Sequence, residues 1–191
     1  MSIAGGYDKA VQRAAAVGCD CLQIFTKNGN QWRDRQVTAE ESSRFAQALS
    51  DFGITCPLAH DSYLINLASP DTDLWKKSLD ALVGELRRAA LLQIPFVVTH
   101  PGAYTTGNEK RGLAAIVRAI DRIHRQTRGI AAECLLETTA GQGTSLGWRF
   151  EQLAAILDGV EEPDRLSVCF DTCHVFAAGY PMGTKGQYDE T

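Results

Sequence analysis

The chain has 191 residues, of which 45% are hydrophobic and 22% are charged, and its formal net charge is −4. This size suits one domain with a sizeable core, the acidic balance argues against holding nucleic acid by bulk electrostatics, and no apolar stretch is long enough to span a membrane. Residues 1–20 lack the basic start and apolar core of a signal peptide, and four of the six cysteines lie in apolar runs as small hydrophobes, so we expect a reduced, cytoplasmic protein.

Short apolar runs alternate with amphipathic segments along the chain. After an opening loop and helix at 2–18, the predicted strands are residues 21–25, 54–59, 94–99, 133–137 and 166–171. Helical patterns lie between them at 38–52, 75–86, 113–123 and 149–160. The first of these opens on a capping-box pattern, Thr38-x-x-Glu41, and Gly53 is a suitable stop. This alternation predicts parallel strands joined by crossover helices.

Polar side chains stand where four consecutive predicted strands end. They are His60, His100, Glu137 and Asp171, and successive members are separated by about one βα unit. In a TIM (β/α)8 barrel such strand ends converge on one face, whereas an open doubly wound sheet gathers ligands only at its switch point. The pattern therefore favours the barrel.

Only five strands can be counted, whereas a closed barrel needs eight. The chain opens without a strand before residues 2–18 and stops shortly after the fifth run. A parallel sheet of five strands would leave unpaired edges. We therefore expect residues 1–191 to form a single partial TIM-barrel domain that lacks the first strand and the C-terminal third.

The strand-end residues have the chemistry of metal ligands. Two imidazoles (His60, His100) and two carboxylates (Glu137, Asp171), with His174 close by, suit zinc, manganese or iron. A carboxylate such as Glu137 can bridge two ions about 3.5–4 Å apart. Taken singly, each histidine can be a hydrogen-bonded structural residue and each acid a helix cap. Their coincidence on successive strands favours a metal centre.

The fourth histidine, His124, lies inside an amphipathic helix, and we expect it to be solvated. Two loops carry other candidate contacts. Tyr63 and Leu64 follow His60, where they can pack on the next helix or wedge between stacked bases. The loop after the first strand carries a basic and aromatic group that suits contact with phosphates and bases. Its members are Lys27, Trp32, Arg33 and Arg35, although such loops are often simply solvated.

Six stretches resemble the endonuclease IV family of apurinic/apyrimidinic (AP) endonucleases, zinc-dependent DNA-repair enzymes built on a TIM barrel. In chain order they are FTKNGNQW (25–32), HDSYLINLA (60–68), HPGA (100–103), LETTAGQG (136–143), FEQLAAILDGVE (150–161) and DTCHVFAAGY (171–180). The resemblance implies that His60, His100 and Glu137 bind one zinc. Glu137 would bridge to a second zinc that Asp171 also binds, and His174 would help to hold a third.

The same resemblance implies hydrolysis of the phosphodiester 5′ to an abasic site in double-stranded DNA, by a multi-zinc mechanism that leaves 3′-hydroxyl ends. Glu137 would be a catalytic residue, a complete enzyme would hold three zinc ions, with manganese as a possible substitute, and the protein would be a monomer that binds no membrane. Residues 63–64 would insert at the lesion, and further DNA contacts would come from Lys27, Asn30 and Trp32. Asn30 stands where many members have arginine, and Thr138 stands where asparagine is commoner.

Two other interpretations stay open. A metal-dependent sugar isomerase or epimerase of the xylose-isomerase-like barrels also places His, Glu and Asp at strand ends. It would turn over small carbohydrates and ignore DNA. The family's later ligands, two histidines, an aspartate and a glutamate beyond the sixth strand, are not in this chain, so the isolated 191 residues are expected to be an inactive, metal-binding fragment.

Overall fold

A computed structural model describes residues 1–191, with five strands, seven α-helices and one 3₁₀ helix. In chain order the elements are α1 (Tyr7–Ala16), β1 (Cys21–Phe25), α2 (Ala39–Phe52), β2 (Cys56–His60), α3 (Thr72–Leu91), β3 (Phe96–Thr99), α4 (Glu109–Gln126), β4 (Glu133–Glu137), α5 (Phe150–Gly159), η1 (Pro163–Arg165), β5 (Leu166–Cys169), α6 (Thr172–Ala177) and α7 (Lys185–Glu190). The predicted alternation of strands and helices is confirmed. Helices α6 and α7 were not predicted, because six residues are too few to show a helical period.

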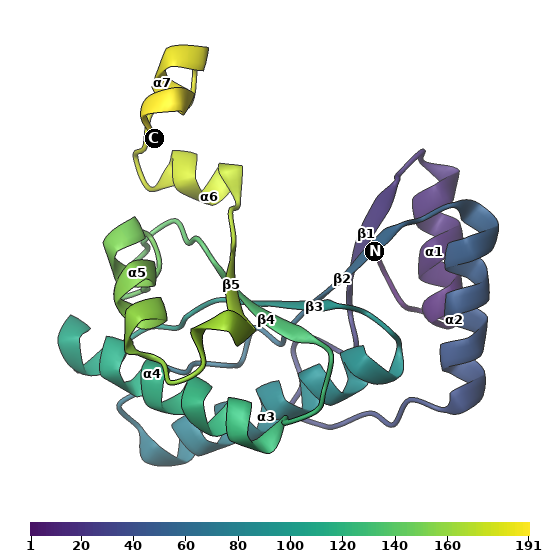
Figure 1. Ribbon diagram of the computed structural model, residues 1–191, viewed down its shortest axis with the longest axis horizontal. Helices are drawn as coiled ribbons and strands as arrows, with labels where there is room; N and C mark the ends of the chain where they lie inside the picture. The colour runs from purple at the N-terminus through teal and green to yellow at the C-terminus, as the bar shows by residue number, and fades with distance from the viewer.

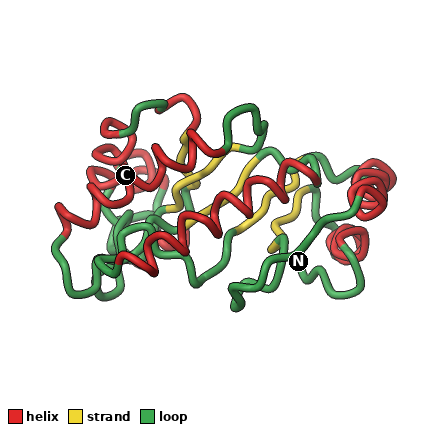
Figure 2. Tube along the Cα trace, turned by 90° about the horizontal axis from the view of Figure 1, so that it is seen from below, coloured by secondary structure: helices red, strands yellow, loops and turns green.

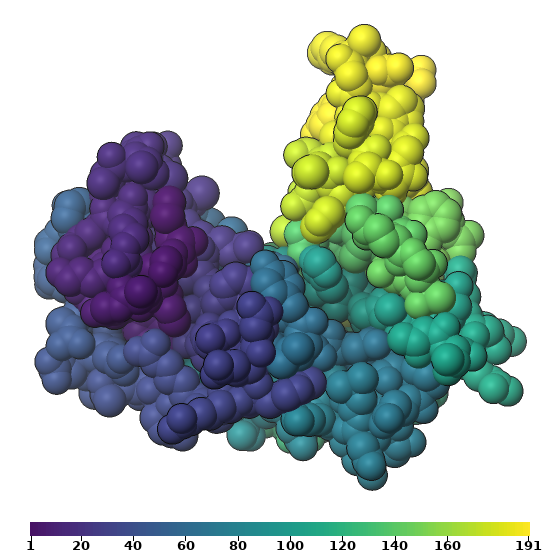
Figure 3. All heavy atoms as spheres, turned by 180° about the vertical axis from the view of Figure 1, so that it is seen from behind, coloured from purple at the N-terminus to yellow at the C-terminus, as the bar shows by residue number.

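The five strands form one parallel sheet in the order β1-β2-β3-β4-β5, which is the connectivity of successive βα units in a TIM barrel. Helices α1 to α5 lie around one face of the curved sheet (Figure 1), and α3 and α4 cross in front of the strands when the molecule is seen from below (Figure 2). The other face is open. Figure 3 shows a hollowed region between the N-terminal part of the molecule and the projecting C-terminal segment.

The strand register brings the predicted ligands to this open face. Phe25 pairs with His60, His60 with Val98, and Glu137 with Cys169. Side chains alternate between faces with a period of two, and paired residues of parallel strands share a face. His100 lies two residues beyond Val98, and Asp171 lies two beyond Cys169. The side chains of His60, His100, Glu137 and Asp171 therefore all point away from the helices, in a stagger that follows the tilt of a barrel.

The ends of the helices are fixed by the expected local chemistry. The Thr38 hydroxyl accepts from the Glu41 amide at 3.1 Å, and the Glu41 carboxylate accepts from the Thr38 amide at 3.0 Å, so the predicted capping box is confirmed. Helix α2 ends at Gly53, whose φ of 67° lies in the left-handed region. The side chains of Asp71 and Asn108 accept from backbone amides in the first turns of α3 and α4, so these residues are the N-caps of the two helices. These caps set where the loops over the strand ends begin and finish.

The hydrophobic core lies between the sheet and the helices, where 35 buried residues form one cluster. The open face explains a difference from the expected placement of the cysteines. All six are free thiols, and Cys134 is buried, but Cys21 and Cys56 are exposed because their side chains leave the helix-covered side. No helix in the chain has the length and apolar character that crossing a membrane requires.

The prediction that His124 is solvated is wrong. Its side chain is 3% exposed, and neither ring nitrogen has a hydrogen-bond partner. His124 follows Ile120 by four residues and therefore falls on the buried face of α4. Burial, and then the nearby Arg165 guanidinium, lower the pKa of this imidazole, so it is a neutral core residue.

Candidate metal centre

Glu137 lies at the centre of the strand-end cluster. Its Oε2 is 2.8 Å from Nε2 of His100 and 3.2 Å from Nε2 of His60, and its Oε1 is 3.5 Å from Nδ1 of His174. The Glu137 side chain is only 8% exposed. The two carboxylate oxygens therefore face two different sets of neighbours, as a bridging ligand requires.

The potential ligand atoms fall into two groups that share Glu137. One group is His60, His100 and Glu137, and the other is Glu137, Asp171 and His174, with the ligand atoms of each group within 4.8 Å of one another. Imidazole nitrogen and carboxylate oxygen are suitable donors for zinc. The structure thus brings together all five residues that the sequence indicated. It places His174 beside Asp171, whereas the resemblance assigned it to a separate third zinc.

His60 is held in position by its surroundings. Its Nδ1 lies 2.9 Å from the Asp61 carbonyl oxygen and 3.4 Å from the Asp61 carboxylate. The centroid of its ring lies 5.5 Å from the centroid of the Phe25 ring. Burial opposes protonation of His60, but the hydrogen bonds to Asp61 and Glu137 outweigh it and raise its pKa to about 10. The metal-free ring therefore carries a proton at neutral pH, which a bound cation must displace.

Thr138 organises the second group. The Asp171 amide donates to the Thr138 hydroxyl at 2.8 Å, and Nδ1 of His174 lies 3.0 Å from the Thr138 carbonyl oxygen. Asp171 caps α6 through Oδ1, which accepts from the His174 amide at 2.8 Å, while its Oδ2 faces the His174 ring. The capping role and the ligand role that the sequence offered as alternatives therefore use different oxygens of one carboxylate.

The predicted wedge residues border the same pocket as the metal ligands. A pocket of about 560 Å³ is lined by Tyr63, Leu64 and Trp32 together with His60, His100 and His174. Tyr63 is 63% exposed, and its ring packs edge-on against Phe25 with 5.1 Å between centroids. An aromatic ring that is held from below and exposed above is suited to contact a large ligand at the rim of the metal centre.

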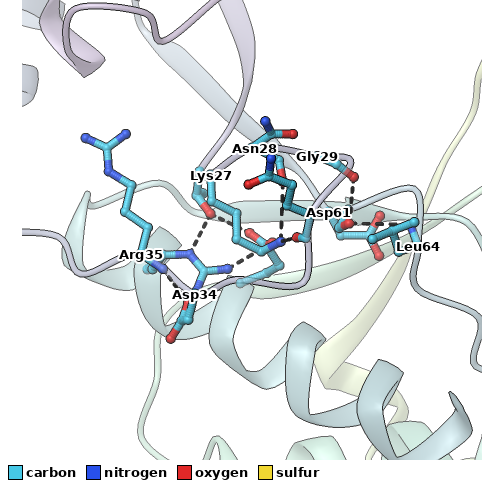
Figure 4. A network of polar contacts seen from close by, with 12 residues as sticks. Lys27, Asn28, Gly29, Asp34, Arg35, Asp61 and Leu64 are labelled. Carbon is cyan, nitrogen blue, oxygen red and sulfur yellow. Dashed lines mark hydrogen bonds and ion pairs between the residues drawn. The ribbon is translucent and has the colours of Figure 1, made fainter.

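Lys27 is placed differently from the other predicted DNA contacts. Its side chain is 5% exposed, and its ammonium lies 3.9 Å from Glu85 in a buried ion cluster beneath the loop at 26–36 (Figure 4). Burial lowers the pKa of this lysine. Glu85 also lies 2.9 Å from Arg88 and accepts from the Thr26 hydroxyl, and Arg88 pairs with Asp34. The ammonium is thus largely buried against Glu85 and joins the loop to helix α3.

The loop at 26–36 is also joined to the segment that carries Tyr63 and Leu64. The Gly29 carbonyl accepts from the Ser62 hydroxyl at 2.6 Å and from the Tyr63 amide at 3.1 Å. A Cβ on Gly29 would lie 3.0 Å from the Phe25 ring, so a side chain there would crowd this contact. Asn30 follows directly and is exposed. These bonds set the position of Asn30 relative to Tyr63.

Several residues that position the site do not stand out in the sequence. Asp61, which is 2% exposed, accepts from the Thr99 hydroxyl and packs against His60, and its only sequence signal is its place after a strand-end histidine. Thr138 is marked in the sequence only as an unusual residue at its position. Glu85 and Arg88 have no signal, because a Glu-x-x-Arg pair on a helix normally faces solvent.

Removing the Glu85 carboxylate should destabilise the fold strongly. A Glu85→Ala variant leaves Lys27 and Arg88 buried without their common acid, and loss of one partner of a buried pair costs about 3–5 kcal/mol. Urea unfolding followed by tryptophan fluorescence measures this free energy. Glu40→Ala, which breaks the exposed pair with Arg44, is the control and should change it far less. Equal effects of the two changes would contradict a structural role for the cluster.

The Thr138→Val change should weaken metal binding at the second group alone. Valine keeps the shape of threonine but removes the acceptor for the Asp171 amide, and loss of such a support lowers metal affinity by about 10–100-fold. Zinc titration in competition with a chromophoric chelator measures the zinc affinity of each of the two ligand groups. Thr139→Val is the matched control, because that hydroxyl binds only the Leu146 carbonyl. Two unchanged binding steps in Thr138→Val would rule out the support.

The sequence and the fold have counterparts among known proteins. A family model described as a xylose isomerase-like TIM barrel matches residues 11–190. A probable endonuclease 4 of Chloroflexus aggregans is 49% identical over 191 residues, which are 100% of this chain and 67% of that protein. A probable endonuclease 4 of Trichlorobacter lovleyi is 46% identical over 188 residues, which are 98% of this chain and 67% of that protein.

Solved structures agree with these sequence matches. The crystal structure of endonuclease IV from Thermus thermophilus has a TM-score of 0.78 and 38% identity, covering 94% of this chain and 64% of that one. A D-psicose 3-epimerase from Clostridium cellulolyticum shares the fold, with a TM-score of 0.66, 18% identity, and coverage of 93% and 62%. The chain spans about two thirds of the length of these proteins. It belongs to the endonuclease IV family, among the xylose isomerase-like TIM barrels.

Proposed function

We propose that this chain carries part of the active site of a metal-dependent DNA-repair endonuclease that hydrolyses the phosphodiester bond 5′ to abasic sites. The observation that carries the proposal is the position of Glu137, whose two oxygens face two ligand groups whose histidines line the same pocket as Tyr63 and Leu64. Membership of the endonuclease IV family supports the nuclease activity.

The residues present fit a pair of cations that share one carboxylate. His60 and His100 offer ring nitrogens to one, and Asp171 and His174 complete the donors to the other. Bound zinc supplies Lewis-acid stabilisation of the charge that develops on phosphate oxygens. The chain itself holds each donor on a strand end or on the first turn of α6, so that little reorganisation is needed when the phosphate binds.

The rim residues suit the recognition of a missing base. An abasic site leaves a gap in the base stack, and apolar or aromatic side chains can enter such gaps and kink the duplex. Tyr63 stands 63% exposed and is supported from below by Phe25. Asn30 and Trp32 lie on the adjoining loop, which the buried ion pairs of Lys27 and Arg88 with Glu85 join to α3. Lys27 contributes in this way rather than by contact with a phosphate.

Further details of the proposal follow from the resemblance. They are three zinc ions in the complete enzyme with manganese as a substitute, 3′-hydroxyl products, double-stranded DNA with abasic sites as the partner, a monomeric state and a cytoplasmic location. We also propose that residues 1–191 in isolation bind metal at the two groups that share Glu137, without cleaving DNA. The epimerase alternative shares the fold, but a small sugar gives no role to an exposed tyrosine at the rim.

Incision of a duplex with one tetrahydrofuran abasic analogue tests the function in the complete gene product that contains residues 1–191. With zinc supplied, we expect a single cut 5′ to the analogue and a 3′-hydroxyl end that a polymerase extends. Glu137→Gln should lower the incision rate by more than about a hundredfold, because the change removes a charge shared by both ligand groups.

Glu133→Gln is the matched control, since Glu133 lies at the opposite end of β4, where its carboxylate accepts from Ser167. This variant should cleave at nearly the rate of the wild type. Absence of incision by the zinc-loaded wild type would refute the nuclease proposal, and turnover of a ketohexose would favour the epimerase.

A further inference from the structure

A second hollow lies beside the metal pocket and is unused by the proposed chemistry. It has a volume of about 470 Å³ and lies between α4 and the segment that leads into α3. Its lining contains no acidic residue. It includes Trp75, Tyr104 and three arginines of α4, namely Arg111, Arg118 and Arg122. We call this site the arginine hollow. Its volume is within the range of small-ligand sites, roughly 300–1,000 Å³.

The arginines of the hollow differ from the others in their partners. Seven of the thirteen arginines pair with an acid, namely Arg35, Arg44, Arg88, Arg125, Arg128, Arg149 and Arg165. Arg13 and Arg87 donate to backbone carbonyls. Of the four guanidinium groups left without either partner, three line the arginine hollow, and the fourth is Arg33. Such a concentration in an acidic chain calls for an anionic partner.

The floor of the hollow leaves these groups available. The Trp75 indole N–H already donates to the Ala115 carbonyl at 3.1 Å, so the ring presents only its apolar face. The Arg122 guanidinium lies over that face, 5.1 Å from the ring centroid, and its N–H groups point outward in their plane. Glu109, the acid in the first turn of α4, is engaged by Arg149. The three guanidinium groups of the hollow therefore have no acidic partner in direct contact.

A hydrogen-bonded wall separates the arginine hollow from the metal pocket. Asn66 and Ala103 line the metal pocket, and their neighbours Ala68 and Tyr104 line the hollow. The side-chain nitrogen of Asn66 donates to the Ala103 backbone carbonyl at 2.9 Å, and its side-chain oxygen accepts from the backbone amides of Ala103 at 2.9 Å and Ala68 at 3.1 Å. Arg111 lies in the first turn of α4, close in the chain to Tyr104 on this wall.

We propose that the arginine hollow binds phosphates of the DNA backbone that flanks the cleavage site, an inference that rests on the proposed function. Guanidinium groups pair with phosphate oxygens in planar, bidentate geometry. Arg111 and Arg122 are eleven residues apart, which is about 16 Å along the helix at 1.5 Å per residue. One phosphate cannot engage groups spread over this length, whereas successive phosphates of one strand can. The class of ligand is thus a phosphodiester chain.

Binding measured over a range of salt concentrations tests this assignment in the complete, zinc-loaded gene product. The probe is a duplex with a tetrahydrofuran site and a non-hydrolysable phosphonate at the scissile linkage, followed by fluorescence anisotropy. Replacing the three arginines of the hollow by glutamine should weaken binding at least about tenfold at low salt. The slope of log K against log[KCl] should become shallower by about 1 to 3, since each lost phosphate contact removes about 0.9.

Two companion variants separate contact from general effects of charge or folding. Replacing Arg44, Arg125 and Arg128 by glutamine removes the same charge from arginines that already have acidic partners, and should leave the slope near that of the wild type. Replacing the three arginines of the hollow by lysine keeps the charges and should keep most of the slope. Zinc stoichiometry and the melting temperature should match the wild type in all three triple variants.

The possible outcomes are distinct. A wild type that binds the abasic duplex no better than an undamaged one contradicts the proposed function before any variant is made. If the wild type prefers the abasic duplex but the glutamine variant of the hollow keeps the salt slope of the wild type, the phosphate assignment alone is overturned. A third outcome is that inorganic phosphate or a deoxynucleoside monophosphate raises the melting temperature of the wild type but not of that variant, while both proteins bind DNA with the same salt slope. The hollow then serves a small ligand, and the DNA assignment is wrong.

Discussion

A carboxylate that is only 8% exposed and is surrounded by three imidazoles is the feature on which the site depends. Hydrogen bonds from His100 and His60 hold the pKa of Glu137 far below its ordinary value, although burial acts in the opposite direction. The group is therefore an anion in a place where an unpaired anion is costly. It is stable there only with positive charge beside it, from protonated His60 in the metal-free chain or from bound cations.

The architecture places that carboxylate by simple repetition. Each βα unit adds a parallel strand, the register steps forward between β2 and β3 and again between β4 and β5, and the alternation of side chains sends each tip residue to the open face. The surrounding loops are then fixed from behind. Asp61 holds His60, and Thr138 holds Asp171. The ion cluster around Glu85 fixes the loop at 26–36, which lies next to Tyr63.

Much of this arrangement could be predicted from the sequence, because it depends on local pattern. The apolar runs predicted the strands, and the polar residue at each run's end predicted the ligand cluster, since parallel strands bring like ends together. The places of Lys27 and His124 could not be predicted in the same way. Lys27 meets Glu85, a helix residue distant in sequence, and His124 is covered by segments around Arg165. The exposure of Cys21 and Cys56 depends on which face the helices leave open, which periodicity does not show.

Anomalous diffraction at the zinc absorption edge, from crystals of residues 1–191 grown with zinc, tests the shared carboxylate most directly. We expect one peak within bonding distance of His60, His100 and Glu137, and a second peak between Glu137, Asp171 and His174. Zinc bound only at other side chains, or peaks that Glu137 does not contact, would contradict the bridging role from which the proposed chemistry follows.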